Sequence, residues 1–208
     1  EPLDPVRHIT NRSSGRMGYA LAEAARDAGA RVTLISAPTG LEPVYGVEMC
    51  AVRTAAEMRE AVMSRLEQMD VLIMAAAVAD YRPAQVAEQK IKKGEGGLVL
   101  ELERTRDILA DVAEARTPGK PGLVVGFAAE TQQILENART KLIGKKLDML
   151  VANDVSAKDS GFEVETNRVT LLTPDGGAES LPLMSKFEVA EHIVERVAAL
   201  WRAIHGRA

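Results

Sequence analysis

The chain has 208 residues, 46% hydrophobic and 27% charged, and this length and composition predict one globular domain over residues 1–208. Its 26 basic and 30 acidic residues give a formal net charge of -4, so the whole-chain balance does not favour nucleic acid as a partner. The single cysteine, Cys50, excludes an intrachain disulfide and a thiolate metal cluster, and is expected to be an inert buried thiol in a reducing compartment.

The sequence has neither of two common targeting features. There is no secretory leader pattern and no apolar run long enough to cross a bilayer, so we expect a cytoplasmic protein with no membrane partner. The sequence opens at "EPLDPVR" without an initiator Met, which suggests processing or excision from a longer chain.

Short β-branched runs alternate with longer helical patterns, which indicates an α/β fold. In the first half, strands are expected at 6–10, 31–36 and 70–81, and helices at 17–28 and 55–68. The run 70–81 is apolar on both faces, as is typical of a central parallel strand. Pro83, a basic cluster and several glycines then predict a mobile, exposed loop over 82–97.

The second half continues the alternation. Strands are expected at 98–103, 122–130 and 147–154, and helices at 107–116, 132–146 and 186 to about 204. Between the strand at 147–154 and the final helix, residues 167–183 predict two strands around an Asp-Gly-Gly turn. The whole pattern predicts a doubly wound, mainly parallel sheet with a C-terminal β-hairpin and a final helix.

Ligands of such folds bind at the carboxyl edge of the parallel strands. The segments that fall at this edge are rich in small or hydrogen-bonding residues, and they are 11–15, 75–81, 126–131 and 153–156. The first of them reads "NRSSG" and precedes a helix, whose unpaired N–H groups favour anions. Asn11, Ser13, Ser14 and Gly15 therefore resemble a phosphate cradle, and the alternative is that one serine simply caps the helix.

Several further residues admit a functional and a structural interpretation. Lys90, Lys92 and Lys93 of "KIKKG" form either a solvated charge run or a lid that closes over a nucleotide. Asp80, expected to be buried at a strand end, requires a partner such as a ribose hydroxyl, Mg²⁺ or a lysine, unless it caps a turn. Phe127 either packs in the core or stacks on a base.

Taken in order, these segments resemble the phosphopantothenoylcysteine synthetase family of coenzyme A biosynthesis. The resemblance extends nearly from end to end, through "EPLDPVRHITNRSSGRMG", "AAAVADYRP", "KIKKG", "VVGFAAET" and "NDVS...GF...N". It implies a Rossmann-like fold, a homodimer, Mg²⁺ as cofactor and CTP as co-substrate. In many bacteria this domain is fused to a flavin-dependent decarboxylase, and that half does not occur in this chain.

The resemblance also implies roles for individual residues. The nucleotide site it implies consists of Ala75, Ala76, Asp80, Lys90, Arg106, Asp107, Ile108, Leu109, Phe127, Lys141 and Lys145. Asn11 is implied to act on an acyl-nucleotide intermediate. The chemistry of the reaction makes Lys90 the second catalytic candidate, because with Mg²⁺ it offsets phosphate charge, and the carboxylate of Asp80 is the candidate ligand of Mg²⁺. One departure is that the family usually has Asn-Pro-Asp where this chain has Thr105, Arg106 and Asp107.

The implied reaction joins 4'-phosphopantothenate to L-cysteine with CTP, through an acyl-cytidylate, and releases pyrophosphate and CMP. A short-chain NAD(P)-dependent oxidoreductase is the first alternative, but Tyr19, Tyr45 and Tyr81 lack the Lys four residues later that this class requires. A non-catalytic nucleotide-binding protein is the second alternative. Turnover of CTP with phosphopantothenate and cysteine separates the three.

Overall fold

The computed structural model describes residues 1–93, 96–130, 134–154 and 164–206. Its main sheet has the strand order β10-β9-β7-β6-β3. These strands are β3 (Val71–Met74), β6 (Leu123–Glu130), β7 (Met149–Asp154), β9 (Val169–Leu172) and β10 (Ala178–Ser180). Strands β3, β6 and β7 are parallel, whereas β9 is antiparallel to β7 and forms the hairpin with β10. The predicted mainly parallel sheet with a C-terminal hairpin is confirmed.

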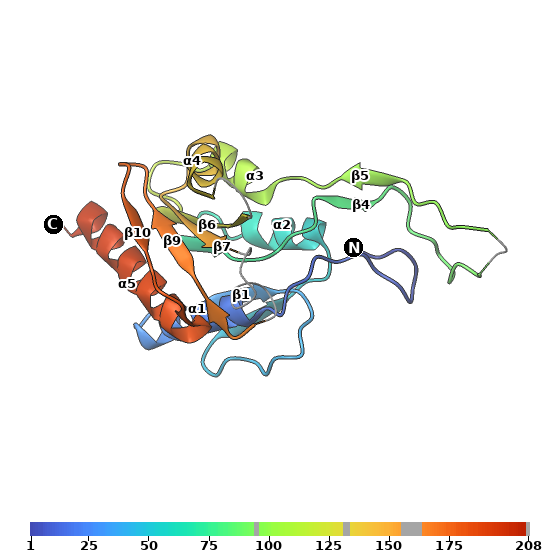
Figure 1. Ribbon diagram of the computed structural model, residues 1–208, viewed down its shortest axis with the longest axis horizontal. Helices are drawn as coiled ribbons and strands as arrows, with labels where there is room; N and C mark the ends of the chain where they lie inside the picture. Colours follow the sequence, from blue (N-terminus) through green and yellow to red (C-terminus); the bar gives the residue numbers. More distant parts are fainter. Residues whose placement is uncertain (94–95, 131–133, 155–163, 207–208) are drawn as a thin grey trace.

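Helices cover both faces of this sheet (Figure 1). On one face lie α1 (Arg16–Asp27) and α5 (Lys186–His205), and on the other α2 (Ala55–Met63), α3 (Ile108–Ala115) and α4 (Ile134–Gly144). Adjacent residues of β6 point to opposite faces, so Val124 packs with the second group and Val125 with the first. Both are almost fully buried, and each contributes about 1.5–3 kcal/mol. The expected doubly wound arrangement is confirmed.

Three smaller strand pairs complete the fold. The parallel pair is β1 (Thr33–Ser36) with β2 (Glu48–Ala51), and β1 contacts both α1 and α2. The antiparallel pairs are β4 (Tyr81–Pro83) with β5 (Leu102–Arg104), and β8 (Thr166–Asn167) with β11 (Met184–Ser185). The sequence patterns did not predict β2, β4, β8 or β11. Cys50, expected to be buried, is only half-buried in β2.

Strands β4 and β5 and the described residues between them form an arm, defined here as residues 81–104, that projects from the body (Figure 1). The expected strand over 98–103 is wrong in extent, because only Leu102–Arg104 pairs and all three of these residues are exposed. The side chains of Leu98 and Val99 are 54% and 93% exposed. The arm therefore carries apolar residues that this chain does not bury.

The expected strand over 6–10 is also wrong. His8 forms only an isolated bridge to Pro2, and residues 1–9 fold back on themselves through bonds from Leu3 N–H to Arg7 O and from Ile9 N–H to Glu1 O. The Asp4 carboxylate accepts from the N–H groups of Val6 and Arg7, so it competes for the donors that a strand would need. We refer to residues 1–9 as the N-terminal loop.

Two other elements are shorter than expected, and the rest agree closely with the prediction. Helix α2 ends at Met63 rather than at 68, and β3 ends at Met74 rather than continuing to 81. Helix α5 begins where the pattern placed it because Ser185 and Glu188 form a capping box. Among the described residues, none of the helices combines the length and hydropathy that crossing a bilayer requires.

Candidate functional site

Residues 75–80, named here the edge turn, connect β3 to the arm at the carboxyl edge of the sheet. The carbonyl groups of residues 77–80 accept hydrogen bonds from Asn11 and Thr105, so this stretch does not continue the ladder of β3. The amide nitrogen of Asn11 lies 3.3 Å from Ala77 O and 3.0 Å from Val78 O and donates to both. The structure therefore brings Asn11 and the edge turn together, as the sheet-edge argument predicts.

The far end of the edge turn is held by Thr105, which precedes α3. Its hydroxyl donates to Ala79 O at 2.5 Å, and its N–H donates to Asp80 O at 2.9 Å. Asp80 is exposed, so the expectation of a buried carboxylate in need of a partner is wrong. The reason is that Asp80 lies at the root of the projecting arm and not at the end of a buried strand. Ala75 is half-buried and Ala76 is exposed.

The start of α3 lies against the end of α4. Asp107 caps α3 by accepting from Ala110 N–H at 3.1 Å, and its other oxygen lies 2.8 Å from Lys145 Nζ. Burial raises the pKa of Asp107, but the hydrogen bonds from Lys145 and from Ala110 N–H outweigh it and hold that pKa below its ordinary value. The ionised carboxylate thus fixes Lys145 beside the N-terminus of α3.

The predicted nucleotide segment at the start of α3 divides into exposed and buried side chains. The side chain of Arg106 is 71% exposed and lies 3.7 Å from the Asp111 carboxylate, which also pairs with Arg59. Ile108 and Leu109 are only 3% and 8% exposed, so their side chains belong to the core. Any contact that these two residues make with a ligand is therefore through the backbone. Lys141 is exposed in the last turn of α4, four residues before Lys145, which follows the end of that helix.

Helix α1 begins after a glycine. Gly15 is the N-cap residue with φ of 75°, in the left-handed region, so the interpretation of Ser13 or Ser14 as the N-cap residue is wrong. A Cβ at Gly15 would also lie 2.7 Å from Thr39 Cγ2, which leaves no room for a side chain. Ser13 is exposed and its Oγ accepts from Gly15 N–H at 3.4 Å, and Ser14 is half-buried.

Two further predicted residues are Phe127 and Lys90, and Phe127 lies level with the start of the edge turn because Gly126 pairs with Met74. Phe127 in β6 is half-buried and packs against the cluster under α1 and α5, and its stacking on a base stays a prediction. Lys90 is exposed on the arm, which extends away from the edge turn (Figure 1). Of the predicted edge segments 126–131 and 153–156, residue 131 and residues 155–156 lie outside the described residues.

The side chains of this region determine which kind of metal site is possible. No group of three or more His, Cys, Asp or Glu side chains that fits a metal ion occurs in the described part of the chain. The predicted ligand Asp80 is a single exposed carboxylate. Mg²⁺ typically keeps several waters and binds through one or two carboxylates together with substrate phosphates. The residues present therefore fit Mg²⁺ that arrives with a nucleotide, and not a cage made by the protein alone.

Sequence reasoning assigned no role to two polar anchors of this region. Thr105 fixes the edge turn, and Asp4 with Arg7 fixes the N-terminal loop against the arm. The Asp-Pro step in "LDPVR" signals a turn in which the aspartate accepts from backbone N–H groups two or three residues later. No local signal announces Thr105, because its partner lies 26 residues away.

The chain is similar to known proteins over almost its whole length. The profile of the family described as DNA/pantothenate metabolism flavoprotein C-terminal domain matches residues 1–200. The coenzyme A biosynthesis bifunctional protein CoaBC of Bacillus subtilis is 51% identical over 201 residues, which are 96% of this chain and 49% of that protein. The chain thus spans about half the length of the curated relatives it matches.

Solved structures give the same fold. The crystal structure of the C-terminal domain of CoaBC superposes with a TM-score of 0.82 at 42% identity, covering 98% of this chain and 91% of that one. A Cab2 variant in complex with phosphopantothenate-cysteine covers all of this chain and 85% of its own, with a TM-score of 0.75. At 17% identity, that likeness concerns the fold alone.

Proposed function

Because this chain belongs to the DNA/pantothenate metabolism flavoprotein C-terminal domain family, we propose that it is a phosphopantothenate–cysteine ligase of coenzyme A biosynthesis. The observation that carries the proposal is the unbroken series of contacts at the sheet edge. It leads from Asn11 to the edge turn, from the edge turn through Thr105 to α3, and from Asp107 to Lys145. Amide, carbonyl and ammonium groups thus form one connected polar path that begins at the carboxyl edge and continues over α3 to Lys145.

The proposed reaction has two balanced steps. In the first, a carboxylate oxygen of 4'-phosphopantothenate attacks the α-phosphorus of CTP, and the bond to pyrophosphate breaks. In the second, the amine nitrogen of L-cysteine attacks the acyl carbon, CMP leaves with the electron pair of the C–O bond, and the nitrogen loses a proton. The amide product is 4'-phosphopantothenoylcysteine.

The residues of the body bind the nucleotide in this proposal. Lys141 on α4 and Lys145 just after it neutralise phosphate charge. The exposed Arg106 and the backbone of Ile108 and Leu109 face the nucleotide from the start of α3, where the N–H of Leu109 also bonds the Asp107 carboxylate. The edge turn, with Ala75, Ala76 and Asp80, offers peptide groups to the pyrimidine edge. Asp80 would hold Mg²⁺, which when bound offsets charge on the phosphate oxygens.

Asn11 is proposed to act on the acyl group. The longer of its two hydrogen bonds, 3.3 Å to Ala77 O, is the weaker one and the one that exchanges for the oxyanion formed in the second step. The shorter bond of 3.0 Å to Val78 O keeps the side chain in place. Ser13, Ser14 and Gly15 at the start of α1 are proposed to cradle a substrate phosphate, since the first turn of α1 presents backbone N–H groups and a partial positive charge.

A homodimer and a shared site are part of the proposal. The exposed apolar side chains of the arm, among them Leu98, Val99 and Leu102, support burial against a second copy. Because Lys90 is on this projecting arm, it is proposed to reach the nucleotide of the partner subunit and not that of its own chain. The natural protein is proposed to be cytoplasmic and to carry a flavin-dependent decarboxylase half, as the bifunctional naming of its relatives suggests.

Sharing of sites predicts that two inactive variants restore each other. In a dimer of one Lys90→Gln chain and one Asn11→Asp chain, the first chain supplies an intact Asn11 and the second an intact Lys90. One of the two sites therefore has both residues, and the other has neither. Random mixing then gives about a quarter of wild-type turnover. The measurement is amide formation after the chains are unfolded and refolded together, and each variant refolded alone is the control. Mixtures that stay as inactive as the separate variants would refute the transfer of Lys90 between subunits.

The proposed nucleotide is tested by selectivity. We expect CTP to bind at least tenfold more tightly than ATP in calorimetry with Mg²⁺ present, because fixed peptide groups of the edge turn discriminate between bases. Only CTP is expected to release pyrophosphate when phosphopantothenate and cysteine are added. Equal binding of the two nucleotides contradicts the selectivity, and CTP binding without turnover favours a non-catalytic nucleotide-binding protein.

A further inference from the structure

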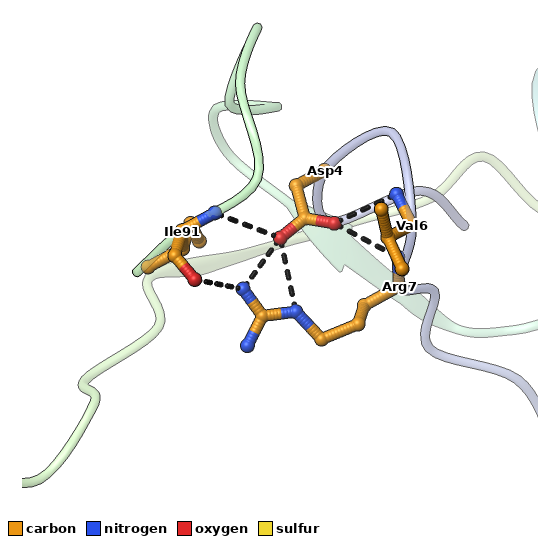
Figure 2. A network of polar contacts seen from close by, with 4 residues as sticks. All are labelled: Asp4, Val6, Arg7 and Ile91. Atoms are coloured by element: carbon orange, nitrogen blue, oxygen red, sulfur yellow. Dashed lines mark hydrogen bonds and ion pairs between the residues drawn. The ribbon is translucent and has the colours of Figure 1, made fainter. Parts of the chain in front are cut away.

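A buried carboxylate connects the N-terminal loop to the arm. The side chain of Asp4 has no exposed surface, although it lies between two irregular segments. One oxygen accepts from the N–H groups of Val6 and Arg7 at 2.8 Å each, and the other from Arg7 Nε at 2.9 Å and from Ile91 N–H at 3.1 Å (Figure 2). Arg7 Nη2 in turn donates to Ile91 O at 2.8 Å. These four residues form the Asp4 cluster.

The Asp4 cluster replaces a missing strand partner. In extended backbone a residue directs its N–H and C=O to the same side, and a neighbouring strand normally pairs with both. At Ile91, the carboxylate of Asp4 accepts from the N–H and the guanidinium of Arg7 donates to the C=O. The side chains of Asp4 and Arg7 thus satisfy both backbone groups of Ile91, as a neighbouring strand would. Asp4 and Ile91 are 87 residues apart in the sequence.

Further bonds extend this attachment to the body. Ala87 N–H donates to Leu3 O at 3.0 Å, so the arm is held at a second point four residues before Ile91. The Glu1 carboxylate accepts from Ala55 N–H at 2.6 Å, at the first residue of α2. The N-terminal loop is therefore a bracket between α2 and the arm.

We propose that Asp4 is a positioning residue that sets the place of the lysine loop, Lys90 to Lys93, on the arm. This role of Asp4 rests on the proposed function, in which Lys90 acts on the nucleotide. Ile91 lies between Lys90 and Lys92, so fixing both polar groups of its backbone fixes the path of the chain on which the two ammonium groups are mounted. Asp4 itself does not touch substrate; it acts through Ile91.

Charge and geometry both require an aspartate here. Hydrogen bonding to Arg7 lowers the pKa of Asp4 far below its ordinary value, so the carboxylate is ionised throughout the range of an enzyme assay. In Asp4→Asn, an NH₂ group replaces one of the two oxygens, and either orientation turns that group towards N–H donors. The variant loses acceptors and the charge that pairs with Arg7, while its size stays the same.

Limited trypsin digestion tests the attachment without any substrate. Trypsin cleaves after lysine, and Lys90, Lys92 and Lys93 are exposed, so the rate of cleavage at these bonds reports local opening of the arm. We expect Asp4→Asn to accelerate that cleavage about tenfold, by mass spectrometry of the fragments, with little change at sites in the body. Asp175→Asn is the matched control, because Asp175 also closes a turn by accepting from Thr173 Oγ1 and Gly177 N–H, in the β9–β10 hairpin.

A double-mutant cycle tests the link to Lys90. Asp4→Asn is expected to slow pyrophosphate release about tenfold in the wild-type background and not at all in Lys90→Gln, because an effect exerted through Lys90 disappears with it. An equal slowing in both backgrounds, or wild-type cleavage rates in Asp4→Asn, overturns the proposal. If the wild-type chain makes no product, the proposed function fails while the trypsin result still decides whether Asp4 holds the lysine loop.

Discussion

Lys90→Gln is expected to slow the formation of acyl-cytidylate by about 100-fold, the size of effect seen when one stabilising donor is removed from a transition state. The glutamine amide keeps much of the length of the side chain and removes its positive charge. Negative charge accumulates on the phosphate oxygens as the phosphopantothenate carboxylate attacks, so the loss falls on the first step. The measurement is pyrophosphate released in a single turnover with CTP and phosphopantothenate and without cysteine.

The same loop provides the control for Lys90. Lys93→Gln removes an identical charge three residues away and is expected to change the rate less than about threefold, which is the scale of a screened surface charge. Binding of CTP is expected to change little in either variant, since the proposed nucleotide contacts from Arg106, Lys141 and Lys145 remain. If Lys90→Gln forms acyl-cytidylate at the wild-type rate, "KIKKG" is a solvated charge run and the arm has another purpose.

Asn11→Asp is expected to lower amide formation by about 100-fold while pyrophosphate is still released from CTP and phosphopantothenate. The substitution preserves shape and replaces the NH₂ donor by an oxygen of a carboxylate that is ionised at neutral pH. An anion beside the oxyanion of the second step is unfavourable, so acyl-cytidylate accumulates when cysteine is present. Quenching the reaction and determining the mass of the intermediate checks this outcome.

The structure adds a second consequence for this variant, because Asn11 also donates to the carbonyl groups of Ala77 and Val78. A carboxylate repels those oxygens, so some loss in the first step accompanies the larger loss in the second. Asn11→Ala separates the two effects, since it removes the donors without adding charge. A complete loss of pyrophosphate release in Asn11→Asp would show that the residue serves only to hold the edge turn, and full amide formation would exclude it from both steps.

Local patterns were sufficient for the regular part of the fold. Strand β6 over 123–130 and the helix beginning after Asp107 lie where they were expected, as does the hairpin around Asp175. Each of these depends on periodicity, a capping side chain or turn residues within a short window. The site was partly predictable for the same reason, because strand ends in parallel sheets meet at one edge, and Asn11 and the edge turn do meet there.

The errors have a different origin. Apolar residues continue past Met74 to Val78, so the pattern extends the strand, whereas Asn11 and Thr105 bind the carbonyl groups that a longer strand would have used. Asp80 was expected to be buried because of its alanine-rich surroundings in the sequence, and it is exposed because the chain leaves the sheet at that point. In each case a partner distant in the sequence decided the local conformation.

Residue spacing along the chain was enough to predict the α/β class, the helices and central strands, and the residue types at the sheet edge, because these depend on patterns within a short window. Long-range contacts set the rest: residues 81–104, which include Lys90, project as an arm, and Asp4 and Arg7 hold Ile91. Such contacts form between polar groups that remain unpaired after the regular elements have formed their own hydrogen bonds. Which groups are left over depends on where the whole chain folds, and no local pattern records it.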